Sequence, residues 1–168
     1  VAYPWAVLTP LFDVSRETMA RLDIYAGLLR KWSPRINLVA KSTLDDLWTR
    51  HFADSAQLYR LAPHPALHWA DLGSGGGFPG LVIALMSMES GSPSRTTLVE
   101  SDARKCAFLR TVIRETEAPE TVVNGRLEEI EPQNEDVLSA RAVAGLPPLL
   151  SYAVRHLRKG GTAIFPIG

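Results

Sequence analysis

The stretch Leu67-His68-Trp69-Ala70-Asp71-Leu72 runs directly into Gly73-Ser74-Gly75-Gly76-Gly77-Phe78-Pro79-Gly80. A short apolar run that ends in glycines is typical of a buried strand that enters a tight turn. Pro79 suits the first position of a helix, and apolar residues continue at helical spacing over residues 81–85. This stretch therefore predicts a strand, a glycine-rich loop and a helix, which together form the first unit of an α/β fold.

The same alternation of strand and helix continues along the rest of the chain. We expect further strands at residues 96–99, 121–123, 136–139 and 162–165, with helices at residues 102–113 and 146–157. Gly160-Gly161 is expected to end the last helix. Strands that alternate with helices indicate right-handed βαβ units, and therefore a mostly parallel sheet that is covered on both faces.

The chain before Pro63 has a helical pattern only. Ser15 can cap a first helix, which Trp32-Ser33-Pro34 is expected to end, and a second helix is expected from residue 43 to about residue 61. The first helix is amphipathic, so its apolar stripe should pack on the remainder of the chain. We therefore expect an N-terminal helical extension over residues 1–62 and a core domain over residues 63–168.

Composition limits the classes of protein that this chain can represent. Its 168 residues, of which 46% are hydrophobic, are enough for one domain with a core, and the net charge of zero gives no general signal for nucleic acid. The single cysteine, Cys106, cannot form an internal disulfide. No apolar run is long enough to cross a membrane and the first residues do not resemble a signal peptide, so a cytoplasmic protein is expected.

The glycine-rich loop should lie at the carboxyl ends of the strands, where ligands bind in open α/β sheets. Its glycines let the backbone approach a ligand, and the helix that follows should offer free N–H groups to a carboxylate or phosphate. The loop lacks the lysine of a phosphate-binding loop, which argues against nucleotide hydrolysis. Residues 75–80 match the dinucleotide pattern G-x-G-x-x-G, but Asp71 followed by Gly73, Gly75 and Gly77 favours S-adenosylmethionine.

Glu100 stands at the end of the second expected strand. A carboxylate at this point can accept hydrogen bonds from both hydroxyls of a ribose. Both kinds of cofactor contain that sugar, so Glu100 supports a nucleoside cofactor without separating the two. The alternative interpretation of Glu100 is a solvated loop charge. A nicotinamide-dependent oxidoreductase therefore stays open as a second hypothesis, although no hydride-transfer pair such as Tyr-x-x-x-Lys is evident.

Several ordered segments carry a family resemblance that covers nearly the whole chain. They are KWSPRINL (31–38), RHFADS (50–55), DLGSGGGFPG (71–80), ESDARKCAFLR (100–110), GRLEEI (125–130) and SARA (139–142). Together they resemble the glucose-inhibited division protein B family, bacterial small-subunit ribosomal RNA methyltransferases of type G. The resemblance implies a Rossmann-like class I fold and transfer of a methyl group from S-adenosylmethionine to N7 of a guanosine in 16S rRNA.

The resemblance also implies particular contacts. By position, Gly73, Phe78, Leu127 and Glu128 should contact the cofactor, with the adenine near the last two. Arg141 matches a family arginine near the cofactor and the substrate entrance, where it could pair with the methionine carboxylate or an RNA phosphate. The implied partner is 16S rRNA or an assembly intermediate of the small ribosomal subunit. The protein itself is expected to be a monomer.

Two departures from the family pattern concern the end of the chain. The family pattern at the end of the fifth strand is Phe-Pro-Lys-Gly, and this chain has Phe165-Pro166-Ile167-Gly168 there. The family fold also adds two more strands after this point. We therefore expect a core that lacks its C-terminal strands. A non-catalytic RNA-binding protein with a vestigial cofactor site stays open as a third hypothesis.

Guanine N7 carries a free lone pair, so we expect no catalytic acid or base and no metal. Asp54 and His51 stand at helical spacing, but their expected role is to hold the N-terminal helices or to shape the substrate entrance. A group of basic residues with aromatic residues between them could contact RNA phosphates. The alternative is that these basic residues only form a solvent-exposed face of the protein. The candidate substrate-binding residues are Arg35, Lys41, Arg50, His51 and Arg141.

Overall fold

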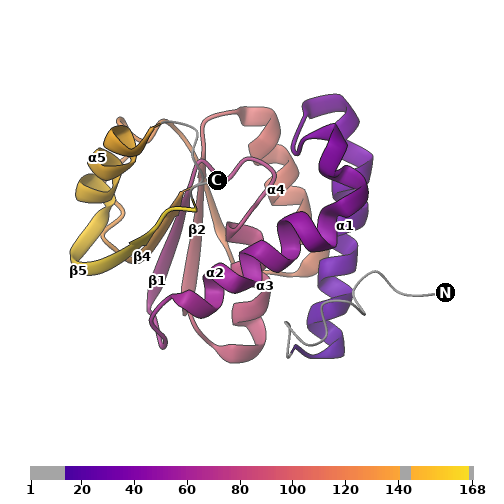
Figure 1. Ribbon diagram of the computed structural model, residues 1–168, viewed down its shortest axis with the longest axis horizontal. Helices are drawn as coiled ribbons and strands as arrows, with labels where there is room; N and C mark the ends of the chain where they lie inside the picture. The colour runs from indigo at the N-terminus through magenta and orange to yellow at the C-terminus, as the bar shows by residue number, and fades with distance from the viewer. Residues whose placement is uncertain (1–13, 141–144, 167–168) are drawn as a thin grey trace.

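The computed structural model describes residues 14–140 and 145–166. Its centre is a five-stranded parallel sheet in the order β3-β2-β1-β4-β5 (Figure 1). The strands are β1 (His68–Leu72), β2 (Arg95–Glu100), β3 (Thr121–Asn124), β4 (Glu135–Ala140) and β5 (Leu157–Ile164). The prediction of a parallel α/β sheet is confirmed. The chain turns from one half of the sheet to the other between the neighbours β1 and β4, which is where such sheets bind ligands.

Helices connect the strands and cover both faces of the sheet. Figure 1 shows α3 (Gly80–Ser90) and α4 (Ala103–Thr116) on one side, together with the N-terminal helices, and α5 (Leu146–His156) on the other. Asp102 caps α4, because its side chain accepts hydrogen bonds from the backbone of Arg104 and Lys105. Between β3 and β4 the chain forms no helix, and the loop of residues 125–134 lies there instead.

The first helix is longer than the sequence predicts. α1 (Arg16–Ile36) begins at the Ser15 cap as expected, but it continues through Pro34, so the prediction that Pro34 ends it is wrong. Proline lacks one N–H, and near the end of a helix this costs a single intrahelical hydrogen bond. The helix ends instead at Asn37, which takes a left-handed conformation (φ 54°) while its N–H bonds to the Ser33 carbonyl.

The second helical region has three parts rather than one continuous helix. It consists of the 3₁₀ helix η2 (Lys41–Asp46), the π-helical turn η3 (Trp48–Phe52) and α2 (Ala53–Leu61). The wider turn of a π-helix changes which side chains face inward. Trp48 and Phe52 are both buried in the core, where their rings stack at a centroid distance of 4.6 Å.

The last strand also differs from the prediction. α5 ends at His156 and β5 begins at the next residue, so Gly160-Gly161 lie inside the strand and do not end the helix. Gly160 has a positive φ of 81°, and the pairing with β4 shifts register at this point, as in a β-bulge. A Cβ on Gly161 would lie 3.0 Å from the Asp136 carbonyl oxygen, so glycine lets the two strands approach.

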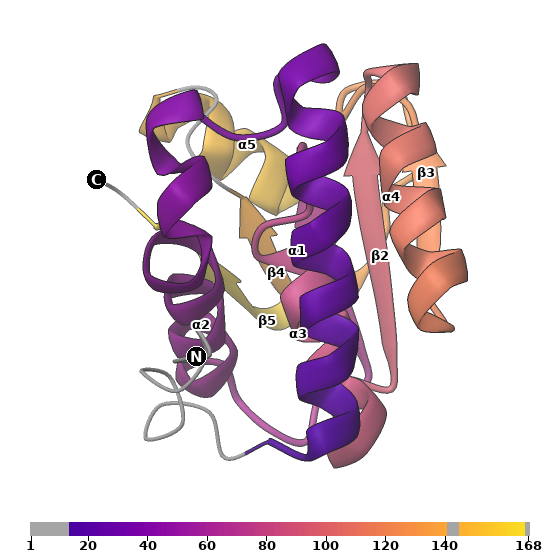
Figure 2. The same cartoon turned by 90° about the vertical axis from the view of Figure 1, so that its right-hand side faces the viewer.

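The N-terminal helices share one hydrophobic core with the α/β part of the chain. The rings of Tyr25 and Phe78 stack at 5.2 Å, and Phe52 and Phe108 pack around Tyr25. Figure 2 shows α1 running alongside the helices of this face of the sheet. The N-terminal segment is therefore packed against the helix that follows the glycine-rich loop.

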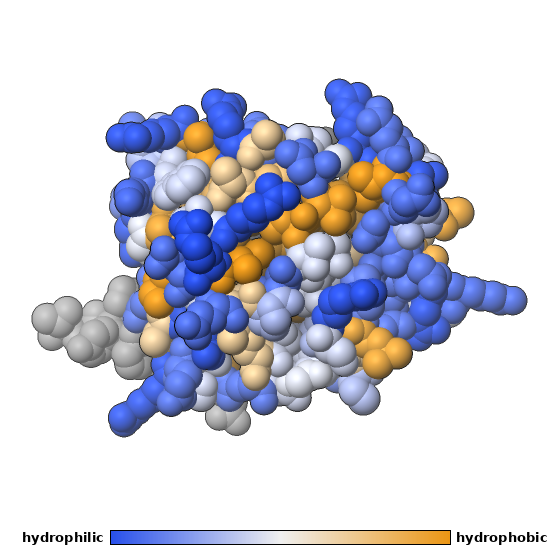
Figure 3. Space-filling view, turned by 180° about the vertical axis from the view of Figure 1, so that it is seen from behind, coloured by the Kyte–Doolittle hydropathy of each residue, from blue (hydrophilic) through white to orange (hydrophobic). Residues whose placement is uncertain are grey.

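Part of the surface is apolar. In the view from behind, apolar residues gather in a band across the face (Figure 3). On α5, the large apolar side chains of Leu146, Leu150 and Val154 recur every four residues and are all exposed, Val154 by 86%. None of the described helices has the length and apolar character needed to cross a membrane.

Candidate functional site

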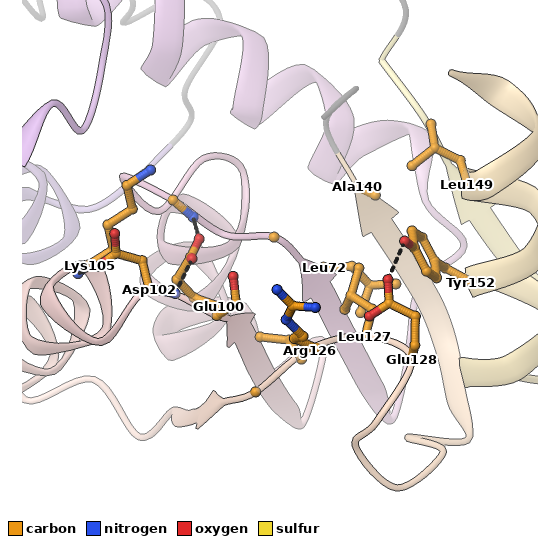
Figure 4. A pocket seen from close by; sticks show the side chains of 15 residues that line it. Leu72, Glu100, Asp102, Lys105, Arg126, Leu127, Glu128, Ala140, Leu149 and Tyr152 are labelled. Atoms are coloured by element: carbon orange, nitrogen blue, oxygen red, sulfur yellow. Dashed lines mark hydrogen bonds between the residues drawn. The ribbon is translucent and has the colours of Figure 1, made fainter. Parts of the chain in front are cut away.

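A cavity of about 680 Å³ opens at the carboxyl ends of β1, β2 and β4 (Figure 4). This volume lies within the range of sites that hold cofactor-sized molecules. Leu72, Val99, Ala140 and Leu149, together with Leu127, form its apolar part. Its other lining residues are Gly73, Gly75, Glu100, Ser101, Asp102, Lys105, Gly125, Arg126, Glu128 and Tyr152.

Glu100 links the glycine-rich loop to the start of α4. Its Oε1 accepts a hydrogen bond from the backbone N–H of Gly75, and its Oε2 accepts one from Asp102, both at 2.8 Å. The residue is only 8% exposed, yet it lines the cavity. Each carboxylate oxygen has a second lone pair, so Glu100 can still accept hydrogen bonds from the hydroxyls of a ribose.

Asp71 faces away from the cavity and is fully buried. Its Oδ2 accepts a hydrogen bond from the Gly80 N–H at 3.0 Å, and its Oδ1 accepts one from the Ser139 hydroxyl at 2.9 Å. The Ser139 hydroxyl in turn accepts a hydrogen bond from the indole N–H of Trp69. In the structure, Asp71 therefore braces the glycine-rich loop against β4.

The start of α3 differs from the expected anion site. The N–H of Gly80 is bonded to Asp71, and the N–H of Leu81 is bonded to the Gly77 carbonyl. The expectation of free N–H groups at this helix is therefore wrong for these two positions. These two N–H groups are therefore not available to the pyrophosphate of a dinucleotide.

Within the loop, Gly77 and Phe78 pack among the aromatic side chains of the N-terminal helices. The Phe78 ring stacks on His51 at 4.8 Å as well as on Tyr25, and it is 6% exposed. The Tyr25 hydroxyl donates a hydrogen bond to the Gly76 carbonyl. The side chains of Phe78 and Tyr25 thus fasten the loop to the N-terminal helices, and neither Gly77 nor Phe78 lines the cavity.

The structure brings together five of the residues predicted to bind the cofactor. Gly73, Gly75, Glu100, Leu127 and Glu128 all line the cavity. Asp71, Gly77 and Phe78 do not, and Arg141 lies outside the described residues.

Sequence reasoning missed the contribution of α5. Tyr152 lines the cavity, and its hydroxyl donates a hydrogen bond of 2.8 Å to Glu128 Oε1 (Figure 4). The pKa of Glu128 is lowered, first by its own backbone N–H and then by this hydroxyl, and Glu128 in turn raises the pKa of Tyr152. Spacing on the helix places Tyr152 near Leu149, but only the fold brings it to the loop after β3.

Four of the five candidate substrate residues belong to the N-terminal helical region, and the fifth, Arg141, lies outside the described residues. Arg35, Lys41 and Arg50 are exposed, whereas His51 is half-buried and its Nε2 lies 2.9 Å from the Thr43 hydroxyl. Figure 2 shows the end of α1, and the segment between α1 and α2, at the end toward which β2 points. The segments that carry these residues therefore lie toward the carboxyl ends of the strands, where the cavity opens.

Comparison with known proteins identifies the family of the chain. The family model described as "GidB: rRNA small subunit methyltransferase G" matches residues 18–166. The chain belongs to the GidB family. A ribosomal RNA small subunit methyltransferase G from Rhodospirillum centenum is 57% identical over 157 residues, which are 94% of this chain and 70% of that protein. The protein of the same name from Ruegeria pomeroyi is 53% identical over 156 residues, 93% of this chain and 76% of that protein.

Solved structures show the same fold at low sequence identity. A methyltransferase from Geobacter sulfurreducens aligns with a TM-score of 0.59 and 19% identity, over 95% of this chain and 74% of that one. M. jannaschii TYW2, solved in complex with AdoMet, aligns with a TM-score of 0.56 and 13% identity, over 67% of this chain and 50% of that one. Membership of the GidB family decides between the two interpretations of the glycine-rich loop in favour of a methyltransferase that uses S-adenosylmethionine.

Proposed function

We propose that this chain transfers a methyl group from S-adenosylmethionine to N7 of a guanosine in 16S rRNA. The observation that carries the proposal is the family match over residues 18–166, together with a cavity whose wall includes Gly73, Gly75 and Glu100. The relatives are named for methylation of small-subunit ribosomal RNA, and N7 of guanosine is the finer part of the proposal.

The residues of the cavity fit this cofactor. Leu72, Val99 and Ala140 offer an apolar surface to a purine ring, and Glu100 can accept the ribose hydroxyls. Carboxylates outnumber cationic side chains in the lining, which suits a cofactor with a positive sulfonium better than an anionic dinucleotide. When bound, S-adenosylmethionine supplies a methyl group that is already activated by the sulfonium.

The carboxylates in the cavity wall all have structural hydrogen bonds. Glu100 accepts from Gly75 and Asp102, while Asp102 caps α4 and Glu128 accepts from Tyr152. The proposal assigns these carboxylates to holding the cavity wall and the cofactor, and not to general base catalysis. Guanine N7 needs no general base, because its lone pair is free at neutral pH. The task left to the chain is to orient the two reactants in line and to exclude water.

Methyl transfer to RNA tests the proposal directly. The chain is incubated with labelled S-adenosylmethionine and 16S rRNA from cells that lack the modification, and the digested RNA is analysed for N7-methylguanosine. We expect label in that nucleoside. The same assay with small-subunit particles distinguishes naked RNA from an assembly intermediate as substrate. If S-adenosylhomocysteine and RNA both bind but neither substrate is labelled, the result favours the non-catalytic RNA-binding alternative. Label in another base would overturn only the choice of N7.

We also propose that Arg35, Lys41 and Arg50 contact RNA phosphates. The double variant Lys41→Glu/Arg50→Glu should weaken RNA binding about 10-fold near 0.1 M salt and flatten its salt dependence, because fewer counterions are released. The matched control is Arg16→Glu/Arg114→Glu, since Arg16 begins α1 and Arg114 lies in the last turn of α4. Filter binding at several salt concentrations measures both, and equal weakening in the control would contradict this RNA surface.

A further inference from the structure

His156 is a fully buried histidine that joins the end of α5 to the loop after β3. Its Nδ1 accepts a hydrogen bond from the backbone N–H of Gln133 at 3.3 Å. Its Nε2 lies 2.7 Å from the carbonyl oxygen of Leu127. Because a backbone N–H can only donate, Nδ1 must be the acceptor and Nε2 must carry the proton, so both bonds form in one neutral tautomer.

We propose that His156 is a positioning residue that holds the backbone of Leu127 and Glu128 at the cavity wall in the conformation that receives the base of the cofactor. The proposal rests on the proposed function, because it concerns the same cavity. Leu127 and Glu128 line that cavity, whereas His156 itself does not. His156 therefore acts through the loop and not by touching the cofactor.

The loop of residues 125–134 needs an outside anchor because it contains no helix or strand. Within the loop, the Arg126 carbonyl accepts hydrogen bonds from the N–H groups of Glu129 and Ile130, which closes a single turn. A segment with so few internal bonds opens easily unless neighbouring elements hold it. Its position at the cavity depends on what packs against it.

α5 supplies that anchor through three side chains on one stretch of helix. Tyr152 bonds to Glu128, and Arg155 donates a hydrogen bond of 2.6 Å to the Ile130 carbonyl. Both of these bonds are exposed, so water can replace them at small cost. His156 is 0% exposed and its two hydrogen bonds are partly buried, so water replaces them less readily than it replaces the two exposed bonds. Of the three side chains, His156 is therefore the one whose removal should affect the loop most.

The protonation state of His156 follows from the same contacts. Burial lowers the pKa of His156, the positive charge of Arg155 lowers it further, and the hydrogen bond to Leu127 only partly offsets this. A protonated imidazole cannot accept from the Gln133 N–H. An imidazole released from the contact would titrate near its ordinary pKa of about 6.5, so acidification below that value favours the released state. The anchor is complete above this pH and weakens below it.

The test measures the affinity for S-adenosylhomocysteine by calorimetry at pH 7.5 and 5.5. His156→Ala removes both bonds and should weaken binding about 10-fold at pH 7.5. His156→Gln keeps an N–H donor for the Leu127 carbonyl and should bind within about threefold of the unmodified chain. Because glutamine does not titrate, its affinity should fall less on going to pH 5.5 than that of the unmodified chain. Hydrogen exchange should show faster opening of residues 125–134 in His156→Ala only.

His64→Ala is the control variant for the loss of two histidine hydrogen bonds, although His64 is exposed and His156 is buried. His64 also makes two hydrogen bonds, to the Ser92 hydroxyl at 2.6 Å and to the Tyr59 carbonyl at 2.7 Å, but it precedes β1 and does not line the cavity. The affinity of His64→Ala for S-adenosylhomocysteine should equal that of the unmodified chain. Normal binding by folded His156→Ala, equal weakening in His64→Ala, or the same pH dependence in His156→Gln would each overturn the inference. If the unmodified chain binds no S-adenosylhomocysteine, the proposed function fails instead.

Discussion

Replacement of Gly77 by alanine is expected to lower the free energy of unfolding by about 3 kcal/mol or more, since backbone strain and overpacking each cost about 1–3 kcal/mol. Gly77 has a φ of 99°, a conformation that alanine rarely adopts. A Cβ there would lie 2.5 Å from both Leu81 Cδ1 and the Tyr25 hydroxyl. Tyr25 is fully buried and bonded to the Gly76 carbonyl, so it cannot move without disturbing the loop itself.

Alanine variants of two other glycines distinguish the contribution of backbone strain from that of overpacking. Gly75 has a φ of 54°, but the nearest atom to its Cβ would be the Gly73 carbonyl oxygen at 3.9 Å, so Gly75→Ala should cost only about 1 kcal/mol of backbone strain. Gly27 lies inside α1 with nothing within 4 Å of a Cβ, and Gly27→Ala should stabilise the chain by about 0.5–1 kcal/mol. Denaturant unfolding measures all three variants. Similar losses for Gly75→Ala and Gly77→Ala would show that packing behind the loop contributes little.

The Glu100→Ala variant is expected to bind S-adenosylhomocysteine about 100-fold more weakly. It loses two charge-assisted hydrogen bonds, to Gly75 and Asp102, and the acceptor for the ribose hydroxyls. Glu100→Gln keeps one acceptor oxygen but turns an amide N–H₂ toward the other backbone N–H. Its affinity should therefore lie between those of the alanine variant and the unmodified chain. Calorimetric titration at one pH measures all three.

Glu89 offers a matched control for this variant. Its carboxylate accepts hydrogen bonds from the backbone N–H of Ser15 at 2.9 Å and from the Thr18 hydroxyl at 2.8 Å, and it does not line the cavity. Glu89→Ala should lower stability at the start of α1 without changing the affinity for the cofactor. Unchanged affinity in Glu100→Ala would mean that the ribose is held elsewhere, and equal weakening in Glu89→Ala would point to a loss of stability as the cause.

Local patterns were sufficient wherever the deciding residues lie next to one another in the chain. The apolar run before the glycines predicts β1 and its loop, and Asp102 predicts the start of α4. Glu100 could be chosen as a site residue because it stands at the end of a strand, and all parallel strands end at the same edge. Each of these inferences uses only short stretches of sequence and the geometry of one regular element.

Local patterns failed where a neighbouring element changes the outcome. Pro34 does not end α1, since its missing N–H falls near the helix end and Asn37 provides the cap. Gly160-Gly161 do not end α5, because they lie against β4 and allow β5 to approach it. Proline and glycine can each end a helix or lie inside a regular element. In both cases the packing of neighbouring segments selects between these two roles.

The sequence by itself determined the α/β alternation and the place of the glycine-rich loop, because apolar periodicity and glycine conformations act over a few residues. Only the tertiary structure decided which acidic side chain faces the cavity. Asp71 turns inward to Gly80 and Ser139, whereas Glu100 turns to the cavity wall. The tertiary structure alone also brought Tyr152 and His156 to the loop after β3. Residues more than twenty positions apart have no local pattern that links them, and they meet only because the sheet places β4 and α5 beside that loop.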